Sequence, residues 1–192
     1  MLALPTAPAP QPRRQIMVGT ALVLAGVVAM VGGLLALYLK FRTTTIDNGE
    51  VWVPKDTKFS MVAANVMLIT LLPIGIFSQW AVYAAKRDDK PHTALALGLT
   101  GLIGLAFINA QAFIFATSAI PANQGTYSYL FYAITGVVMA LAIAGVVFTA
   151  VTAFRYLGGR TTDRAIVSAH ALYWYAFSAV FAVVWFVVYV TK

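Results

Sequence analysis

Five long apolar stretches, separated by shorter polar segments, make up most of this chain. They cover residues 17–39, 61–85, 93–117, 127–154 and 168–190, and none of them contains Asp, Glu, Lys or Arg. A helix needs about 20 apolar residues to cross a bilayer, and irregular backbone in hydrocarbon would leave its polar groups unpaired. The pattern therefore predicts an all-α membrane protein, with five transmembrane helices in an antiparallel bundle.

The segments outside these stretches predict a simple domain organisation. Residues 1–16 are rich in Pro and Ala, so we expect them to form a disordered cytoplasmic tail. Residues 17–192 are expected to form a single transmembrane domain.

Basic residues predict the orientation, because the cytoplasmic segments of membrane proteins are enriched in Lys and Arg. With the N-terminus inside, eight basic residues fall on the inner side and five on the outer side. The inner set is Arg13, Arg14, Lys86, Arg87, Lys90, Arg155, Arg160 and Arg164, and the outer set is Lys40, Arg42, Lys55, Lys58 and Lys192. We therefore expect the N-terminus inside and the C-terminus outside.

Composition narrows the chemistry that the chain can perform. It is 61% hydrophobic and 10% charged, whereas a typical soluble domain is about one quarter charged. There is no cysteine, and His92 and His170, the two histidines, cannot form a metal site alone. Membrane pathways for ions and protons usually use ionisable side chains, which the spans lack. We predict no catalytic, cofactor-binding or metal-binding residue, and no nucleic-acid partner, since the net charge of +7 is spread over loops and termini.

Small residues at a spacing of four mark helix faces that allow close backbone contact. Three such sets are Ala25, Ala29 and Gly33, then Gly136, Ala140 and Ala144, and finally Ala96, Thr100 and Gly104. They predict tight packing of the first, fourth and third helices, although small residues are also simply common in membrane helices. Gln111 is one of the few polar residues at membrane depth. We expect it to form an interhelical hydrogen bond, with a quinone or lipid contact as the alternative.

The last apolar stretch differs from the others because it is rich in aromatic residues, including Tyr173 and Trp174. Large rings hinder a close backbone crossing, so we expect this helix to face lipid or a broad interface with another subunit. His170 lies near its start and is expected to cap the helix or to lie at the membrane surface.

Several motifs resemble the cytochrome c oxidase subunit III family. Residues 171–175 (ALYWY), continuing through Ser178 and Phe181 to Val188 and Tyr189, resemble the closing helix of that family. Further resemblances are QWAVYAAKRD at 79–88, the region 104–115 around Gln111, FYAITG at 131–136, and the outer-loop residues Trp52 and Pro54. Together they cover nearly the whole chain from residue 17 to residue 192, in the order of the family.

The ionisable positions of the family are replaced by apolar or neutral residues. Its membrane Glu residues correspond to Val27 and Ile114, its paired His residues to Val138 and Leu141, and the His and Asp of its last helix to Tyr175 and Ser178. The support of proton uptake that the family implies for these positions does not transfer to this chain, whereas the helical scaffold does.

The resemblance implies a five-helix bacterial form of subunit III in the cell membrane. Such a subunit is non-catalytic and stabilises the catalytic subunit of a respiratory haem–copper oxidase, or of a related nitric oxide reductase. Haem and copper are then expected in that partner, and other respiratory subunits and membrane lipid are further partners. Two other hypotheses stay open. One is a small transporter or permease, for which Pro73 offers a candidate helix break, and the other is a stand-alone membrane assembly factor.

Overall fold

The computed structural model describes residues 15–54, 57, 60–118, 120, 125–159 and 164–191. This part of the chain forms the helices α1 (Gln15–Asp47), α2 (Met61–Lys86), α3 (Lys90–Thr117), α4 (Gly125–Leu157) and α5 (Arg164–Val184). A π-helical segment, Trp185–Val190, continues α5. All five spans are long and apolar enough to cross a membrane, as the sequence predicted.

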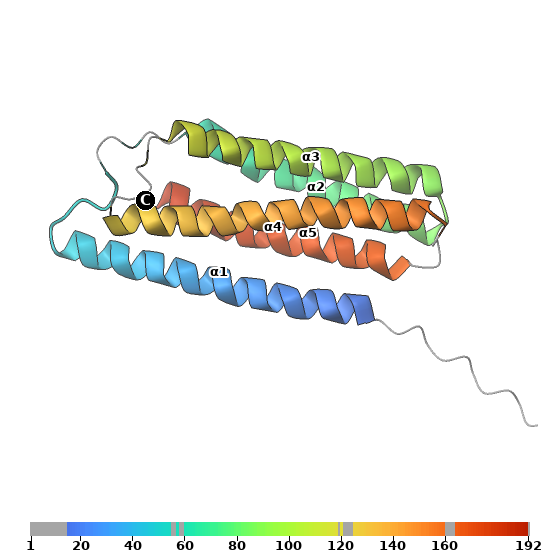
Figure 1. The fold of residues 1–192 in the computed structure, drawn as a ribbon, viewed down its shortest axis with the longest axis horizontal. Coiled ribbons are helices and arrows are strands. Elements are labelled where there is room, and N and C mark those ends of the chain that lie inside the picture. The colour runs from blue at the N-terminus through green and yellow to red at the C-terminus, as the bar shows by residue number, and fades with distance from the viewer. Residues whose placement is uncertain are drawn as a thin grey trace, which may run out of the picture.

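The five helices lie side by side along one direction (Figure 1). The turn between α2 and α3 lies at one end of the bundle, which we name the turn end, and the connection between α1 and α2 lies at the other, the loop end. Arg164 at the start of α5 is also at the turn end, since its Nη2 lies 2.6 Å from Oδ2 of Asp88.

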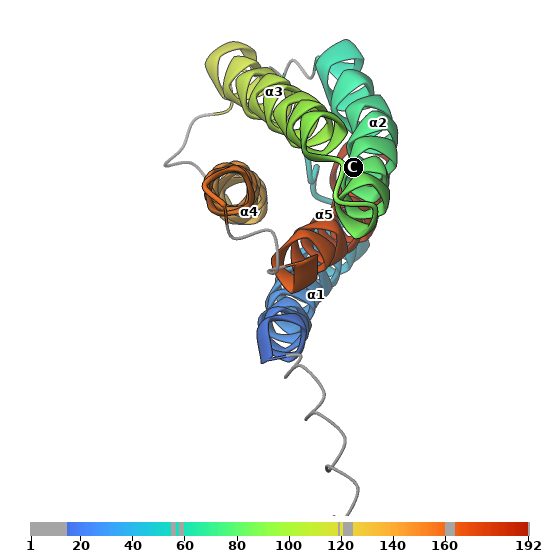
Figure 2. The same cartoon turned by 90° about the vertical axis from the view of Figure 1, so that its right-hand side faces the viewer.

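The last helix, α5, is the centre of the bundle. Figure 2 shows it between α1 and α2. Half of the residues in its most apolar stretch are buried inside the protein, against 22% to 28% in the other four spans. Helices α1, α2 and α4 pack directly against α5, whereas α3 packs against α2 and α4 and reaches α5 through side chains such as Phe107. Helix α1 lies at the edge, with most of its surface exposed.

Several helix ends differ from the expected boundaries. The first helix continues past Leu39 to Asp47, and only then does the chain turn at Gly49, whose φ is +77°. It also begins at Gln15, so residues 15 and 16 belong to the helix; the rest of the expected tail lies outside the described residues. The length of the apolar stretch indicates how much of the helix lies in hydrocarbon. The helix itself ends only where the backbone leaves the helical conformation, often at a glycine.

Pro73 does not interrupt α2, which continues as one helix from Met61 to Lys86. The candidate helix break for a transporter site is therefore absent at this position. A proline is tolerated inside a membrane helix where neighbouring groups pair with the backbone carbonyl that it leaves free.

At the loop end, a buried tryptophan ties the connection after α1 to the bundle. The ring centroid of Trp52 lies 5.3 Å from that of Tyr38 on α1 and 5.5 Å from that of Tyr127 on α4, both edge to face. Aromatic pairs prefer this geometry, so the connection is fixed against two helices.

At the turn end, Asp89 caps α3. Its Oδ1 accepts a hydrogen bond from the backbone N–H of His92 at 3.2 Å, and its Oδ2 lies 2.7 Å from Nδ1 of the same residue. The hydrogen bond from the His92 side chain, followed by that from its backbone, lowers the pKa of the Asp89 carboxyl below its ordinary value. His92 thus lies in the first turn of α3, with an exposed side chain.

Candidate functional site

A buried polar cluster joins α4 and α5 at the centre of the bundle. The Trp174 Nε1–H lies 3.1 Å from Thr149 Oγ1 and 3.0 Å from His170 Nε2. Thr149 Oγ1 is also 2.8 Å from His170 Nε2 and donates to the Gly145 carbonyl at 2.8 Å. Burying a polar group is costly unless it is hydrogen-bonded; here the three side chains meet at His170 Nε2, whereas His170 Nδ1 has no partner among the described residues.

Two glycines make room for the Trp174 ring. A Cβ added at Gly145 on α4 would lie 2.9 Å from two atoms of this ring and 2.9 Å from the Tyr173 ring. A Cβ added at Gly104 on α3 would lie 2.8 Å from Val146 Cγ2 and 3.1 Å from Trp174. Both glycines are therefore needed for this close packing.

The sequence interpretation missed this cluster. Its signal was a pair of i, i+4 spacings, Gly145 with Thr149 on α4 and His170 with Trp174 on α5, which place each pair on one helix face. A spacing of this kind is common, and nothing in the sequence shows that the helix face with Gly145 and Thr149 contacts the one with His170 and Trp174.

The expectation for the aromatic residues of the last helix was wrong for most of them, although Tyr175 and Phe186 are exposed as expected. Tyr173, Trp174, Phe177, Phe181 and Tyr189 are buried in the core of this chain, not turned to lipid or to another subunit. The Tyr173 hydroxyl donates to the Leu141 carbonyl at 2.6 Å. Large rings fit here because the neighbouring helices have glycines at the points of contact.

The expectation that His170 caps the last helix was also wrong. Its side chain is fully buried, with an exposed fraction of 0%, and α5 begins at Arg164, more than one turn earlier. It does not cap the helix, and its depth in the membrane stays a prediction. Its role in the structure is to join Thr149 and Trp174.

The three sets of small residues lie in different environments. Ala96, Thr100 and Gly104 of α3 are buried against neighbouring helices. The set on α1 (Ala25, Ala29 and Gly33) is exposed, and in the set on α4 (Gly136, Ala140 and Ala144) the two alanines are exposed and Gly136 is partly buried. A Cβ added at Gly33 or Gly136 would meet no described atom within 4 Å. The sets on α1 and α4 therefore do not pack against another helix of this chain, and an interface with another polypeptide stays a prediction for them.

The two amides of α3 point to different sides, as their spacing requires. Gln111 is fully buried beside the Tyr189 hydroxyl, whereas Asn109 is exposed. Gln111 thus lies where the π-helical end of the last span meets α3. The interhelical hydrogen bond expected for it stays a prediction.

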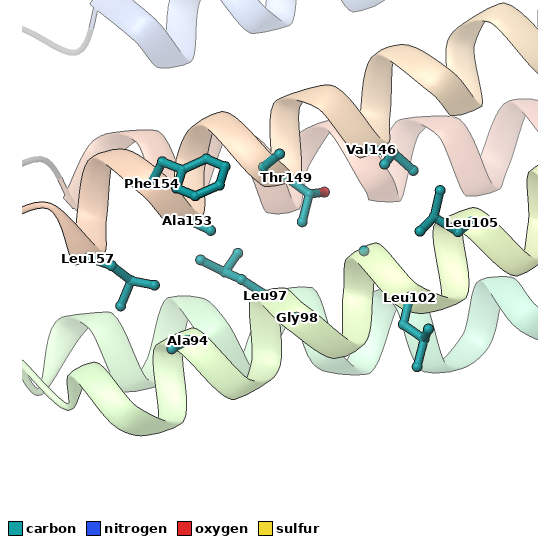
Figure 3. Close-up of a pocket in the computed structure, with 12 residues that line it drawn as sticks. Ala94, Leu97, Gly98, Leu102, Leu105, Val146, Thr149, Ala153, Phe154 and Leu157 are labelled. Carbon is teal, nitrogen blue, oxygen red and sulfur yellow. The ribbon is translucent and has the colours of Figure 1, made fainter.

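A groove opens between α3 and α4 in the half of the bundle nearest the turn end. Its volume is about 500 Å³, and its lining is almost wholly apolar. Figure 3 shows Leu97 and Leu105 of α3 on the side that faces Thr149 and Val146 of α4. Small residues create the space, among them Ala94, Gly98 and Gly101 on one side and Ala150 and Ala153 on the other. Thr149 connects the groove to the buried polar cluster.

Four positions aligned with ionisable family residues have structural roles here. Ile114 and Val138 are buried in the core. Tyr175 is exposed and its hydroxyl donates to Gln79 Oε1 at 3.0 Å, and Ser178 Oγ donates to the Trp174 carbonyl at 2.8 Å. Among the residues that the structure describes, no three His, Asp or Glu side chains meet in a way that could hold a metal ion.

Five long apolar helices around a buried aromatic centre define a multi-pass helical membrane protein. The family model described as cytochrome c oxidase subunit III matches residues 11–192. The chain therefore belongs to the cytochrome c oxidase subunit III family.

Curated relatives have the same family name. The chain is similar to a cytochrome c oxidase subunit 3 of Corynebacterium diphtheriae, with 26% identity over 92% of this chain and 86% of that protein. It is 26% identical to a probable cytochrome c oxidase subunit 3 of Rickettsia felis, over 78% of this chain and 58% of the relative. A Xenopus laevis cytochrome c oxidase subunit 3 is 26% identical over 84% of this chain and 62% of that protein. The chain thus spans less than two thirds of the Rickettsia and Xenopus relatives and most of the Corynebacterium one.

Proposed function

We propose that this chain is a non-catalytic integral subunit of a respiratory haem–copper oxidase, bound to the subunit that holds haem and copper. The match of residues 11–192 to the subunit III family supports this most directly. The spans contain no formal charge apart from residues at their ends, which suits a supporting role better than a proton or ion pathway. Its contribution is to stabilise the catalytic subunit in the membrane. A related nitric oxide reductase is the second candidate complex, since the family's ionisable positions are replaced in this chain.

The proposal includes an orientation. The helices run antiparallel, with the N-terminus on the cytoplasmic side of a bacterial plasma membrane and the C-terminus outside. Among the described residues, Lys86, Arg87, Lys90, Arg155 and Arg164 belong to the helix ends and turn that would then face the cytoplasm. This excess of basic residues is typical of cytoplasmic segments.

The exposed small residues of α1 and α4 are the proposed interface. Helices in lipid associate through close backbone contact rather than through burial of apolar surface. Ala25, Ala29 and Gly33 offer such a face on α1, and Gly136, Ala140 and Ala144 offer one on α4. Tyr173, Trp174 and Gln111 hold the helices that present these faces, and so act on the interface indirectly.

Ala140→Leu tests the interface on α4. The added side chain would separate the helices, so we expect about fivefold less haem protein to co-purify with the tagged chain, corresponding to a loss of about 1 kcal/mol. The measurement is haem absorbance and copper content after affinity purification from native membranes in a mild detergent. Ala106→Leu is the control, since Ala106 is exposed on α3 outside the proposed interface.

An equal loss in Ala140→Leu and Ala106→Leu would contradict the interface on α4. Purification of the wild-type chain with no haem protein at all would contradict the oxidase role. Solute movement by the chain alone in liposomes would then favour a transporter, and migration as a small single species without transport would favour a stand-alone assembly factor.

We also propose that the groove between α3 and α4 holds an acyl chain of a membrane lipid. Its apolar lining and its position between two spanning helices favour a hydrocarbon occupant.

Gly98→Leu should lower the amount of phospholipid that stays with the purified chain. A Cβ at Gly98 meets open space within 4 Å among the described atoms, so the leucine side chain can enter the groove without displacing its own bundle. Phospholipid phosphorus per polypeptide measures the effect. Gly26→Leu on the exposed side of α1 is the matched control. Equal phospholipid content in the two variants would contradict lipid binding in the groove.

A further inference from the structure

The turn between α2 and α3 presents basic residues at the level where the apolar spans end. Lys86 is the last residue of α2, Arg87 follows it, and Lys90 is the first residue of α3. The residues before them, from Trp80 to Ala85, are apolar or aromatic. The basic residues therefore lie at the boundary between hydrocarbon and water.

The two acidic residues of this turn already have partners. Asp88 Oδ2 is 2.6 Å from Arg164 Nη2, and Asp89 is held by the side chain and backbone of His92. No ion pair joins Lys86, Arg87 or Lys90 to a carboxylate within the described ranges of the chain. The turn therefore presents three cations that form no direct ion pair with its own two acids.

The guanidinium of Arg87 is oriented by an aromatic ring. Its Cζ lies 4.0 Å from the centroid of the Tyr83 ring, one helical turn earlier. A guanidinium over an aromatic ring is attracted by the face of the ring, and arginine can donate two parallel hydrogen bonds to a phosphate.

A cavity of about 250 Å³ lies beside this arginine. Its lining residues are Trp80, Tyr83, Ala84, Arg87, Asp89 and His92. The rings of Trp80 and His92 are 5.9 Å apart, so α2 and α3 both contribute to its walls. The Asp89 carboxylate also lines it, but both of its oxygens contact His92.

We propose that this cavity binds the phosphate of an anionic membrane phospholipid, with Arg87 as the main contact and Lys86 and Lys90 as supporting charges. Trp80 and Tyr83 are typical of side chains at the headgroup level. Anionic lipids are attracted by basic residues next to membrane spans. The site is separate from the groove between α3 and α4, and it does not depend on the identity of the partner complex.

Arg87→Gln tests the site in the full chain, purified in a mild detergent and titrated with phosphatidylglycerol by native mass spectrometry. We expect the dissociation constant to rise about fivefold, since one basic residue near an anionic surface contributes about that factor. Tyr83→Leu, which removes the stacking ring and keeps the charge, should raise it by a smaller factor. Lys40→Gln removes the same charge at the loop end, on an exposed side chain, and should leave it unchanged.

Three results would overturn the proposal. The first is an unchanged dissociation constant in both Arg87→Gln and Tyr83→Leu. The second is an equal rise in Arg87→Gln and Lys40→Gln, which would mean that overall charge and not this cavity attracts the lipid. The third is displacement of the lipid by inorganic phosphate or glycerol 3-phosphate at matched concentration, which would identify a site for soluble phosphate. The neutral-headgroup reference is phosphatidylcholine, which should bind more weakly than phosphatidylglycerol in the wild type and equally in Arg87→Gln.

Discussion

Gly145→Val should destabilise the isolated chain by about 3 kcal/mol. Its Cβ alone would lie 2.9 Å from the Trp174 and Tyr173 rings, and the two methyl groups would add to the clash. Overpacking of a well-filled core costs about 1–3 kcal/mol. The upper end applies because both rings are held by hydrogen bonds, through Trp174 Nε1 and the Tyr173 hydroxyl, and cannot move away without breaking them. Thermal or denaturant unfolding in detergent measures the change.

Gly136→Val is the matched control for this prediction. It makes the same substitution in the same helix at a site where an added Cβ meets no described atom within 4 Å. We expect it to change the stability of the isolated chain by less than about 1 kcal/mol, mainly through helix propensity. Similar losses in the two variants would show that the tolerance of α4 for a β-branched residue, and not the fit of the rings, decides the outcome.

Trp174→Ala should cost about 3–5 kcal/mol of stability in the same assay. The substitution leaves a large void and removes the indole N–H that contacts Thr149 and His170, and truncation of buried aromatic side chains costs about this much. Since lipid is as apolar as the core, the loss arises from contacts between closely packed atoms rather than from exposure to water. Phe186→Ala on the same span is the control, because that ring is 54% exposed.

The double variant links these two predictions. If Trp174 is the obstacle that valine meets at position 145, its removal makes space for the added methyl groups. Gly145→Val combined with Trp174→Ala should then lose clearly less stability than the sum of the single variants, as residues in direct contact are not additive. Additive losses would contradict the contact.

The sequence was sufficient to predict the spans. The thickness of the hydrocarbon layer sets how long an uncharged apolar stretch must be to cross it, and this length does not depend on which helices lie beside the span. It was less informative about where the helices end. The first helix continues through Lys40 and Arg42, since charged residues outside the hydrocarbon are compatible with a helix, and it ends where Asn48 and Gly49 turn the chain.

The burial of individual faces could not be predicted from one helix at a time. Small residues favour close contact, but Ala25 and Ala140 are exposed whereas Gly104 is buried. The rings of α5 are buried because Gly104 and Gly145, on two other helices, face them. Such complementarity joins residues that are far apart in the sequence, and the interpretation of a single helix omits the partner.

The groove and the charged cavity illustrate the same difficulty at the candidate sites. Arg87 and Lys90 were expected to set the orientation, and their spacing gives no sign that Arg87 stacks on Tyr83. In the sequence, Gly98 and Gly101 are indistinguishable from other small residues of a membrane helix. Only the position of α4 opposite them shows that they line a groove. In both cases the residue types were visible in the sequence, and the site arises from what lies across from them.

The central position of α5 has a consequence for biosynthesis. Of the five spans, α5 is synthesised last, so α1, α2 and α4 are in the bilayer before the helix against which they pack. A nascent chain that stops before residue 164 would hold helices that have lost the surface on which α1 and α2 rest. Only a polypeptide that includes α5 can therefore bury the interior of the bundle.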